Sequence, residues 1–424
     1  MKNIVFLIGT YSPNFSAGGK CMRNIINELE KSYNITVICL NSKINQLPNE
    51  NFQLHKIRRI YTTKIKNRLF IENKILDSKG IKNKFFLILK KAHQLKYYLK
   101  TLISKETVDY SLTNAYFNEL KKLNNTNIII PVCFPFESIL ASIMYKELFS
   151  KVTVIPVLID LFSIHGNLHR TTLNKKLKFK NNLKLEKEII INSEKIIYLD
   201  QWSKHLKKYF FEYRSKFCLF EHPLLIQPKV IQKNLFDKNR INIVYAGSLD
   251  KRIRPPQYTL ELFNKIYDIN KDIIFHMYIT GNCYDIVKKY RIIHPNFLIV
   301  HKDVDSNIAD AAVFNGDFLI ALGVTAYKQF TGKIFDYMAT GKPIIYLYFH
   351  KDDIAMPVLK KYPIQICLDQ NDDIEINKVK LNKFISENIG KTISFEEVSR
   401  IFPTALPEYS AQLIRDIIEI ELFK

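Results

Sequence analysis

The chain has 424 residues, of which 47% are hydrophobic and 25% charged, and its formal net charge is +22. This composition excludes disordered and fibrous proteins, and the length exceeds the roughly 250–300 residues at which a single core stops growing, so we expect two domains. No segment approaches the ~18 uninterrupted apolar residues of a membrane span, and the apolar run at residues 4–8 is too short for a signal peptide, which predicts a cytoplasmic protein.

The cysteines are scattered through the chain, without a C-x-x-C pair or a cluster flanked by histidines. This spacing favours reduced, buried thiols over disulfides or metal ligands. The sequence also lacks a dense Asp-x-Asp or His cluster, so we expect neither a metal nor a cofactor.

The chain opens with the pattern of a Rossmann-type domain. Residues 4–8 predict a buried strand, a helix is expected to begin near Gly18 and Gly19, and residues 35–40 predict the next strand. The pattern lacks G-x-G-x-x-G, so it does not support a dinucleotide site. The two glycines either let a ligand approach the backbone closely or simply form a turn.

Further strands and helices alternate through the first half. The predicted strands span residues 52–57, 127–131, 152–159, 195–199 and 217–220, and the predicted helices residues 138–149, 175–191 and 203–211. Asp160 follows a strand at its carboxyl end, where doubly wound sheets bind ligands, and is our first candidate for a catalytic base. His165 is the second candidate. The structural alternatives are a helix cap for Asp160 and an ordinary loop histidine for His165.

A second alternation of strands and helices follows a connector at residues 226–240. Its strands are predicted at residues 241–246, 273–280, 297–300, 318–322 and 343–347, and its helices at 256–269, 285–291 and 307–314. The fold class is therefore α/β, with two tandem Rossmann-like domains. We assign residues 1–225 to the first domain, 241–400 to the second and 401–424 to a C-terminal helical tail.

The stretch from Thr331 to Pro343 predicts a short helix between two strands of the second domain. Thr331, Gly332 and Lys333 place backbone N–H groups, a hydroxyl and a cation at the helix start, which favours a phosphate. Asp336 in the first turn can accept hydrogen bonds from ribose hydroxyls. A capped amphipathic helix that binds no ligand explains the same pattern.

This stretch, together with the tandem plan and the strand end from Val244 to Ser248, resembles the group 1, family 4-like glycosyltransferases of GT-B fold. The strong match covers residues 331–345. The resemblance implies transfer of a sugar, without a metal and with retention, from a nucleotide-sugar donor bound by the second domain. It places the acceptor on the first domain and the reaction in an interdomain cleft.

The resemblance also implies roles for individual residues. Asp336 matches the acid that binds the donor ribose, and the backbone from Thr331 to Lys333 matches the pyrophosphate contacts. Other donor contacts are implied for Gly18, Gly19 and Gly247, and for one of the cations Lys251, Arg252 and Arg254. One position departs from the family: many members carry an acid eight residues before Asp336, where this chain has Lys328. The donor sugar and the anomeric outcome therefore stay open.

Positive charge is concentrated in residues 56–105, which contain fifteen Lys and Arg residues and two acidic ones, Glu72 and Asp77. Lysines here alternate with Phe, Leu and Tyr, the composition of surfaces that bind anionic membranes. Solvated surface helices and a nucleic-acid surface are the alternatives, although no known nucleic-acid-binding motif is present. We expect a peripheral protein on the inner face of the plasma membrane.

The sequence thus predicts a glycosyltransferase that acts on a lipid-linked or polysaccharide acceptor in cell-surface glycan assembly. Its expected partners are a nucleotide-sugar, a glycan or lipid-linked acceptor and an anionic membrane, with no specific nucleic acid. A sugar epimerase of the same fold is the enzyme alternative. A noncatalytic protein that binds a sugar nucleotide or nucleic acid is the alternative from another class.

Overall fold

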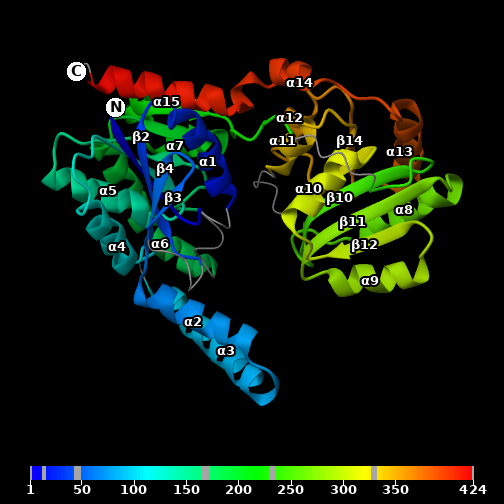
Figure 1. The fold of residues 1–424 in the computed structure, drawn as a ribbon, viewed down its shortest axis with the longest axis horizontal. Coiled ribbons are helices and arrows are strands. Elements are labelled where there is room, and N and C mark those ends of the chain that lie inside the picture. The colour runs from blue at the N-terminus through cyan, green and yellow to red at the C-terminus, as the bar shows by residue number, and fades with distance from the viewer. Residues whose placement is uncertain are drawn as a thin grey trace. The chain divides into compact units, whose positions relative to one another are not determined.

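The computed structural model describes residues 2–11, 16–42, 49–104, 106–164, 171–228, 235–325 and 332–422. The chain divides into one compact unit of Met1–Pro223 with Pro407–Lys424, and a second of Leu224–Leu406. The expected boundaries differ from this division, because the last helix, α15 (Pro407–Leu422), belongs to the first unit and forms no separate tail (Figure 1). It packs on α1 (Ala17–Leu29), where the Arg415 guanidinium donates to the Glu28 carbonyl at 2.9 Å.

The first unit is built on a mainly parallel sheet with the strand order β3-β4-β2-β1-β5-β7-β8-β9, in which β6 also pairs with β5. Only the β3–β4 pairing is antiparallel among the described pairings. The strands are β1 (Asn3–Ile8), β2 (Asn34–Leu40), β3 (Asn49–Phe52), β4 (His55–Ile60), β5 (Ile128–Cys133), β6 (Thr153–Val154), β7 (Val157–Leu158), β8 (Ile196–Leu199) and β9 (Phe217–Phe220). The helices that connect them are α4 (Tyr110–Leu120), α5 (Glu137–Leu148), α6 (Thr172–Asn192) and α7 (Ser203–Tyr209).

Two predicted strands of this unit are wrong in their bounds. The strand expected at residues 52–57 is interrupted by a turn in which Gln53 has a φ of 55°, so Phe52 ends one strand and His55 begins the next. The strand expected at residues 152–159 is split into β6 and β7 on either side of Pro156, which has no N–H group for the ladder.

The second unit has a fully parallel sheet among its described strands, in the order β12-β11-β10-β13-β14-β15. This is the order 3-2-1-4-5-6 of doubly wound nucleotide-binding sheets, so the prediction of two Rossmann-like domains is confirmed. The strands are β10 (Ile241–Leu249), β11 (Ile273–Gly281), β12 (Leu298–Lys302), β13 (Phe318–Leu322), β14 (Ile344–Tyr348) and β15 (Gln365–Asp369). The helices are α8 (Gln257–Ile269), α9 (Tyr284–Ile293), α10 (Ser306–Asn315), α11 (Lys333–Met338), α12 (Met356–Leu359), α13 (Ile374–Asn388) and α14 (Phe395–Ile401).

A pair of helices, α2 (Thr63–Asp77) and α3 (Gly80–Ile103), extends from the sheet of the first unit between β4 and α4 (Figure 1). Helix α2 buries Ile65, Leu69 and Ile71, whereas α3 exposes apolar residues at intervals of three or four along one face. We call this face the α3 stripe: Ile81, Phe85, Ile88, Ala92, Leu95 and Leu99. The exposed fraction of Ile81 is 87% and that of Ile88 is 66%, so the stripe faces solvent.

None of the described helices combines the length and the apolar composition that a bilayer crossing requires. The α3 stripe lies on a helix rich in lysine.

Gly341, which ends the predicted helix of the second domain, has a φ of 72°, and a Cβ at this position would overlap the carbonyl oxygen of Ile393. Gly390 is a matched control, because its φ is 71° and a Cβ there would meet nothing within 4 Å. We expect Gly390→Ala to lower the free energy of unfolding by about 1–2 kcal/mol through backbone strain. Gly341→Ala should cost about 1–3 kcal/mol more through overpacking. Urea unfolding followed by circular dichroism measures both, and equal losses would contradict the packing account.

Candidate functional site

The candidate site of the second unit lies at the carboxyl ends of β10 and β13. These strands are neighbours in the sheet, and the chain leaves them toward opposite edges, which makes their junction the topological switch point. Doubly wound sheets bind ligands in the crevice that such a junction opens. Gly247 lies near the carboxyl end of β10, Arg254 lies in the turn that follows this strand, and α11 is the next described helix after β13.

Helix α11 is hydrogen-bonded to the carboxyl half of β10 through the backbone N–H and C=O groups of one residue, Ala246. The Lys333 ammonium donates to the Ala246 carbonyl. The Tyr337 hydroxyl donates to the same carbonyl at 3.1 Å and accepts from the Ala246 N–H at 3.3 Å. These contacts fix the short helix on the strand and place the charge of Lys333 at the strand end.

Asp250 shapes the loop that follows β10. Its carboxylate accepts hydrogen bonds from the backbone N–H groups of Arg252 at 2.8 Å and Ile253 at 3.0 Å, and these bonds hold the pKa of Asp250 below its ordinary value. The Asn282 amide donates to the other carboxylate oxygen at 2.7 Å. In the resulting turn the backbone of Arg254 forms an isolated antiparallel β-bridge with the backbone of Asp250, close to the end of β10.

Arg254 is the loop cation that the structure places at the switch point. Its side chain lines a small cavity together with Gly247 and Lys333, whereas Lys251 and Arg252 lie exposed on the turn. The Arg254 Nε is buried and has no hydrogen-bond partner among the described residues. A buried guanidinium N–H that lacks an acceptor can bind an anionic ligand.

Two buried tyrosines surround this cation. Burial raises the pKa of both Tyr245 and Tyr337, so their hydroxyls stay protonated, and the positive charge of Arg254 partly opposes the shift. Asp336 is half-buried in the first turn of α11, and its charge adds to the raised pKa of Tyr337. The carboxylate and the two cations Arg254 and Lys333 thus gather around the same strand end.

The cavity between these residues has a volume of about 20 Å³, close to that of one water molecule. Lys333, one of its lining residues, is exposed to solvent. Gly332, the cap residue of α11, is half-buried, and a Cβ there would lie 2.6 Å from the Leu224 side chain. Thr331 and Lys328 lie outside the described residues.

The predicted glycines of the first unit lie at the start of α1. The Gly19 N–H donates to the Ser16 hydroxyl at 3.0 Å, which in turn donates to the Thr10 carbonyl at 3.2 Å. A Cβ on Gly19 would overlap that carbonyl oxygen, so the packing of the loop itself requires glycine here. A Cβ on Gly18 would lie 3.1 Å from the Ile159 side chain, which puts Gly18 next to the strand end that carries Asp160.

Asp160 lies exposed after β7, and its carbonyl oxygen accepts from the Cys133 thiol at 3.6 Å. Burial raises the pKa of Cys133, and the charges of Asp160, Glu186 and Glu137 raise it further. Cys133 ends β5 and Glu137 begins the next helix, so Asp160 and Glu137 both lie near the end of β5, beside the β1–β5 switch point of the first sheet. His165, the second predicted base, lies outside the described residues.

Glu137 is a candidate that the sequence interpretation missed. It lies in the first turn of α5 and accepts a hydrogen bond from the Asp109 N–H at 2.7 Å. Burial raises the pKa of its carboxyl group. The sequence feature that could have indicated Glu137 is its position as an acidic residue in the first turn of α5, the helix that follows the central strand β5.

Comparisons with known proteins identify the fold. No family model and no curated protein matches the sequence. Among solved structures, sucrose-phosphate synthase from Thermosynechococcus elongatus is similar over 100% of this chain and 99% of that one, with 12% identity and a TM-score of 0.63. The chain has the GT-B fold.

A mutant of S. aureus TarM in complex with UDP matches over 100% of both chains at 11% identity and a TM-score of 0.55. WaaG, a glycosyltransferase involved in lipopolysaccharide biosynthesis, shares this GT-B fold with a TM-score of 0.55, 8% identity and coverage of 97% of this chain and 99% of that one.

The placement of Arg254 predicts how anion binding responds to substitution. Arg254→Gln should weaken the binding of inorganic pyrophosphate at least about tenfold, because it removes a charge-assisted donor at the switch point. The matched change Arg252→Gln removes the same charge from an exposed position of the same turn and should alter the affinity less than about twofold. Isothermal titration calorimetry on both variants measures this difference. Equal losses would show that the loop acts only through its total charge.

Proposed function

We propose that this protein is a glycosyltransferase that moves a sugar from a nucleotide-sugar donor to a lipid-linked or polysaccharide acceptor at a membrane surface. The observation that carries the proposal is that Gly247, Arg254 and Lys333 line one cavity at the switch point of the second sheet, with Asp336 in the first turn of the helix that carries Lys333. Sucrose-phosphate synthase, TarM and WaaG, with which the chain shares its fold, support the same reaction class.

The donor half of the reaction breaks the bond between the anomeric carbon and the phosphate oxygen. The electron pair leaves with the nucleoside diphosphate, so negative charge grows on the phosphates while positive charge grows on the sugar. In this proposal Arg254 and Lys333 stabilise the departing phosphates and supply the positive charge that a metal would otherwise provide. Asp336 would accept hydrogen bonds from the ribose hydroxyls and fix the nucleotide beside them.

The acceptor half needs a base for the hydroxyl that attacks the sugar. Asp160 is exposed at the carboxyl end of β7, and Glu137 lies nearby at the end of β5. Burial raises the pKa of Glu137, which makes it a stronger base than an ordinary carboxylate when it is ionised. We assign the proton transfer to Asp160 and the orientation of the acceptor to Glu137.

The α3 stripe supports the proposed membrane partner. Lys84 and Lys91 flank it on one side and Lys96 on the other, as the helical spacing requires. Apolar side chains on such a helix enter the headgroup region while the lysine stems extend to the phosphates. Each fully buried side chain contributes about 1.5–3 kcal/mol, and each lysine near an anionic surface about 1 kcal/mol.

Nucleotide-sugars should raise the melting temperature of the wild-type protein, and Asp336→Ala should remove most of that shift by deleting the ribose contact. A thermal-shift screen of UDP-, GDP-, dTDP- and CMP-sugars measures both. Asp317→Ala is an unsuitable control, because the Asp317 carboxylate accepts from the Asn242 N–H at 2.7 Å. Asp352→Ala removes an exposed acid of the same unit and should leave the shift intact. If no nucleotide stabilises the wild type, or Asp336→Ala responds as the wild type does, the donor assignment is wrong.

The membrane partner predicts stronger binding to anionic than to neutral vesicles in low salt. Ile88→Ser should reduce that binding several-fold, because it removes an exposed apolar side chain from the α3 stripe. Ile376→Ser is the matched control, since Ile376 is also exposed but belongs to the second unit. Cosedimentation with phosphatidylglycerol vesicles measures the effect. Equal binding to both vesicle types, or equal losses in the two variants, would refute the membrane assignment.

A further inference from the structure

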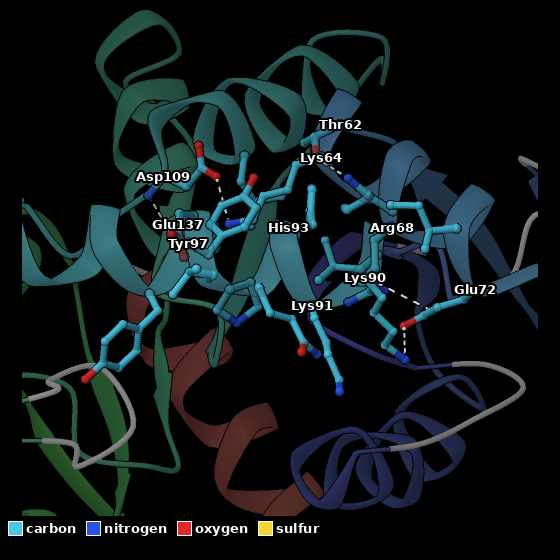
Figure 2. Close-up of a pocket in the computed structure, with 18 residues that line it drawn as sticks. Thr62, Lys64, Arg68, Glu72, Lys90, Lys91, His93, Tyr97, Asp109 and Glu137 are labelled. Atoms are coloured by element: carbon cyan, nitrogen blue, oxygen red, sulfur yellow. Dashed lines mark hydrogen bonds and ion pairs between the residues drawn. The ribbon is translucent and has the colours of Figure 1, made fainter. Parts of the chain in front are cut away.

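A pocket of about 830 Å³ lies at the base of the α2–α3 helix pair in the first unit (Figure 2). Its walls come from α2, α3 and the chain that follows β2, β4 and β5, so it opens at the carboxyl edge of the sheet. Its volume falls in the range of small-molecule sites, about 300–1,000 Å³. One of its lining residues is Glu137, to which the proposed function assigns the orientation of the acceptor.

The pocket has chemically different ends. On one side Glu72 lies 3.9 Å from the Arg68 guanidinium and 3.7 Å from the Lys90 ammonium, and Lys91 lies close by (Figure 2). Both distances exceed those of hydrogen bonds. Glu72 therefore attracts the two cations, but the N–H groups that face it can still donate hydrogen bonds to a ligand. Lys91 has no ion-pair partner among the described residues. Three cations beside one carboxylate leave this end positive.

The opposite end carries carboxylates and an aromatic surface. Asp109 and Glu137 lie there with Tyr97, whose ring packs against His93 at a centroid distance of 4.9 Å (Figure 2). The Lys64 ammonium lies 4.2 Å from the Tyr97 ring centroid and 3.5 Å from the Asp109 carboxylate. Carboxylates accept hydrogen bonds from several hydroxyls at once, and an aromatic face binds the apolar face of a sugar.

The pocket is continuous with the exposed apolar face of α3. Leu95 belongs to the α3 stripe and also lines the pocket, together with Ile65 and Ile71 of α2. A hydrocarbon chain that leaves the pocket past Leu95 therefore enters the surface that would contact the bilayer. Neither feature alone requires a lipid, but their junction favours a ligand with a polar head and an apolar tail.

We propose that this pocket binds the headgroup of a lipid-linked saccharide acceptor, with its phosphate at Arg68, Lys90 and Lys91 and its hydroxyls at Asp109 and Glu137. The assignment as the acceptor site rests on the proposed function. In this proposal the lipid has one hydrocarbon chain, which extends from the phosphate past Leu95 into the membrane. Binding in this orientation presents the sugar hydroxyls toward the end of β5, where Glu137 and Asp160 lie around Cys133.

Dodecyl phosphate, used as a monomer with the full-length protein, tests the phosphate end. Calorimetry should show binding at least about tenfold tighter than that of inorganic phosphate, because the chain adds apolar contacts. The double variant Arg68→Gln/Lys91→Gln should lose about tenfold or more in affinity. The control Lys79→Gln/Lys82→Gln removes two charges from exposed positions of the same helix pair outside the pocket and should lose less than about twofold. Equal losses in the two variants, or no preference for dodecyl phosphate over inorganic phosphate, would overturn the proposal.

Lysophosphatidylinositol, which joins a phosphate to a hydroxyl-rich ring and one chain, tests the carboxylate end. Glu137→Gln should leave dodecyl phosphate binding unchanged and weaken lysophosphatidylinositol binding about fivefold, because a neutral amide is a weaker acceptor than a carboxylate. An equal effect on both ligands would overturn the assignment of the hydroxyl end.

These outcomes separate the pocket from the proposed function. If dodecyl phosphate binds as expected but no nucleotide-sugar stabilises the same protein, the pocket stands as a lipid-phosphate site and the transferase proposal fails. If nucleotide-sugars stabilise the protein but dodecyl phosphate binds no better than inorganic phosphate, the transferase proposal stands and the acceptor pocket is refuted.

Discussion

The candidate donor site depends on the attachment of α11 to the end of β10 at Ala246. Lys333 and Tyr337 both use the peptide groups of this one residue, so a short helix that could not hold its own position is fixed by the sheet. The same contacts set the place of Asp336 on that helix. Burial raises the pKa of Tyr337, so its hydroxyl keeps the proton that it donates to the Ala246 carbonyl.

The two units differ in the charge that lies at their switch points. In the second unit the cations Arg254 and Lys333 line a cavity at the switch point of the parallel sheet, where we propose that the donor phosphates bind. In the first unit Asp160 and Glu137 lie near the end of β5, where we propose that the acceptor hydroxyl is deprotonated. Much of the excess positive charge of the chain lies outside both groups, on the helix pair of α2 and α3, and α3 turns an apolar face to solvent. That arrangement is unfavourable in water and favourable at a membrane surface.

Much of the fold followed from local patterns, because buried parallel strands and amphipathic helices have distinct periods. The errors in the predicted strand bounds also have local causes. Hydrophobicity alone predicted continuous strands, but a turn at Gln53 and the missing N–H group of Pro156 interrupt them. The site residues were harder to predict from the sequence than the fold. Lys251, Arg252 and Arg254 are equivalent as sequence, and only the turn built on Asp250 turns Arg254 toward the strand end. The packing of α15 on α1 joins segments from the two ends of the chain, which no local pattern encodes.

Sugar transfer by this chain can be measured directly by mass spectrometry of both products. The protein is incubated with a nucleotide-sugar mixture and membrane vesicles that contain lipid-linked saccharides. We expect a lipid product heavier by one sugar residue, formed together with an equal amount of nucleoside diphosphate. An isomerised nucleotide-sugar without release of nucleoside diphosphate, or no turnover of any donor, would refute sugar transfer.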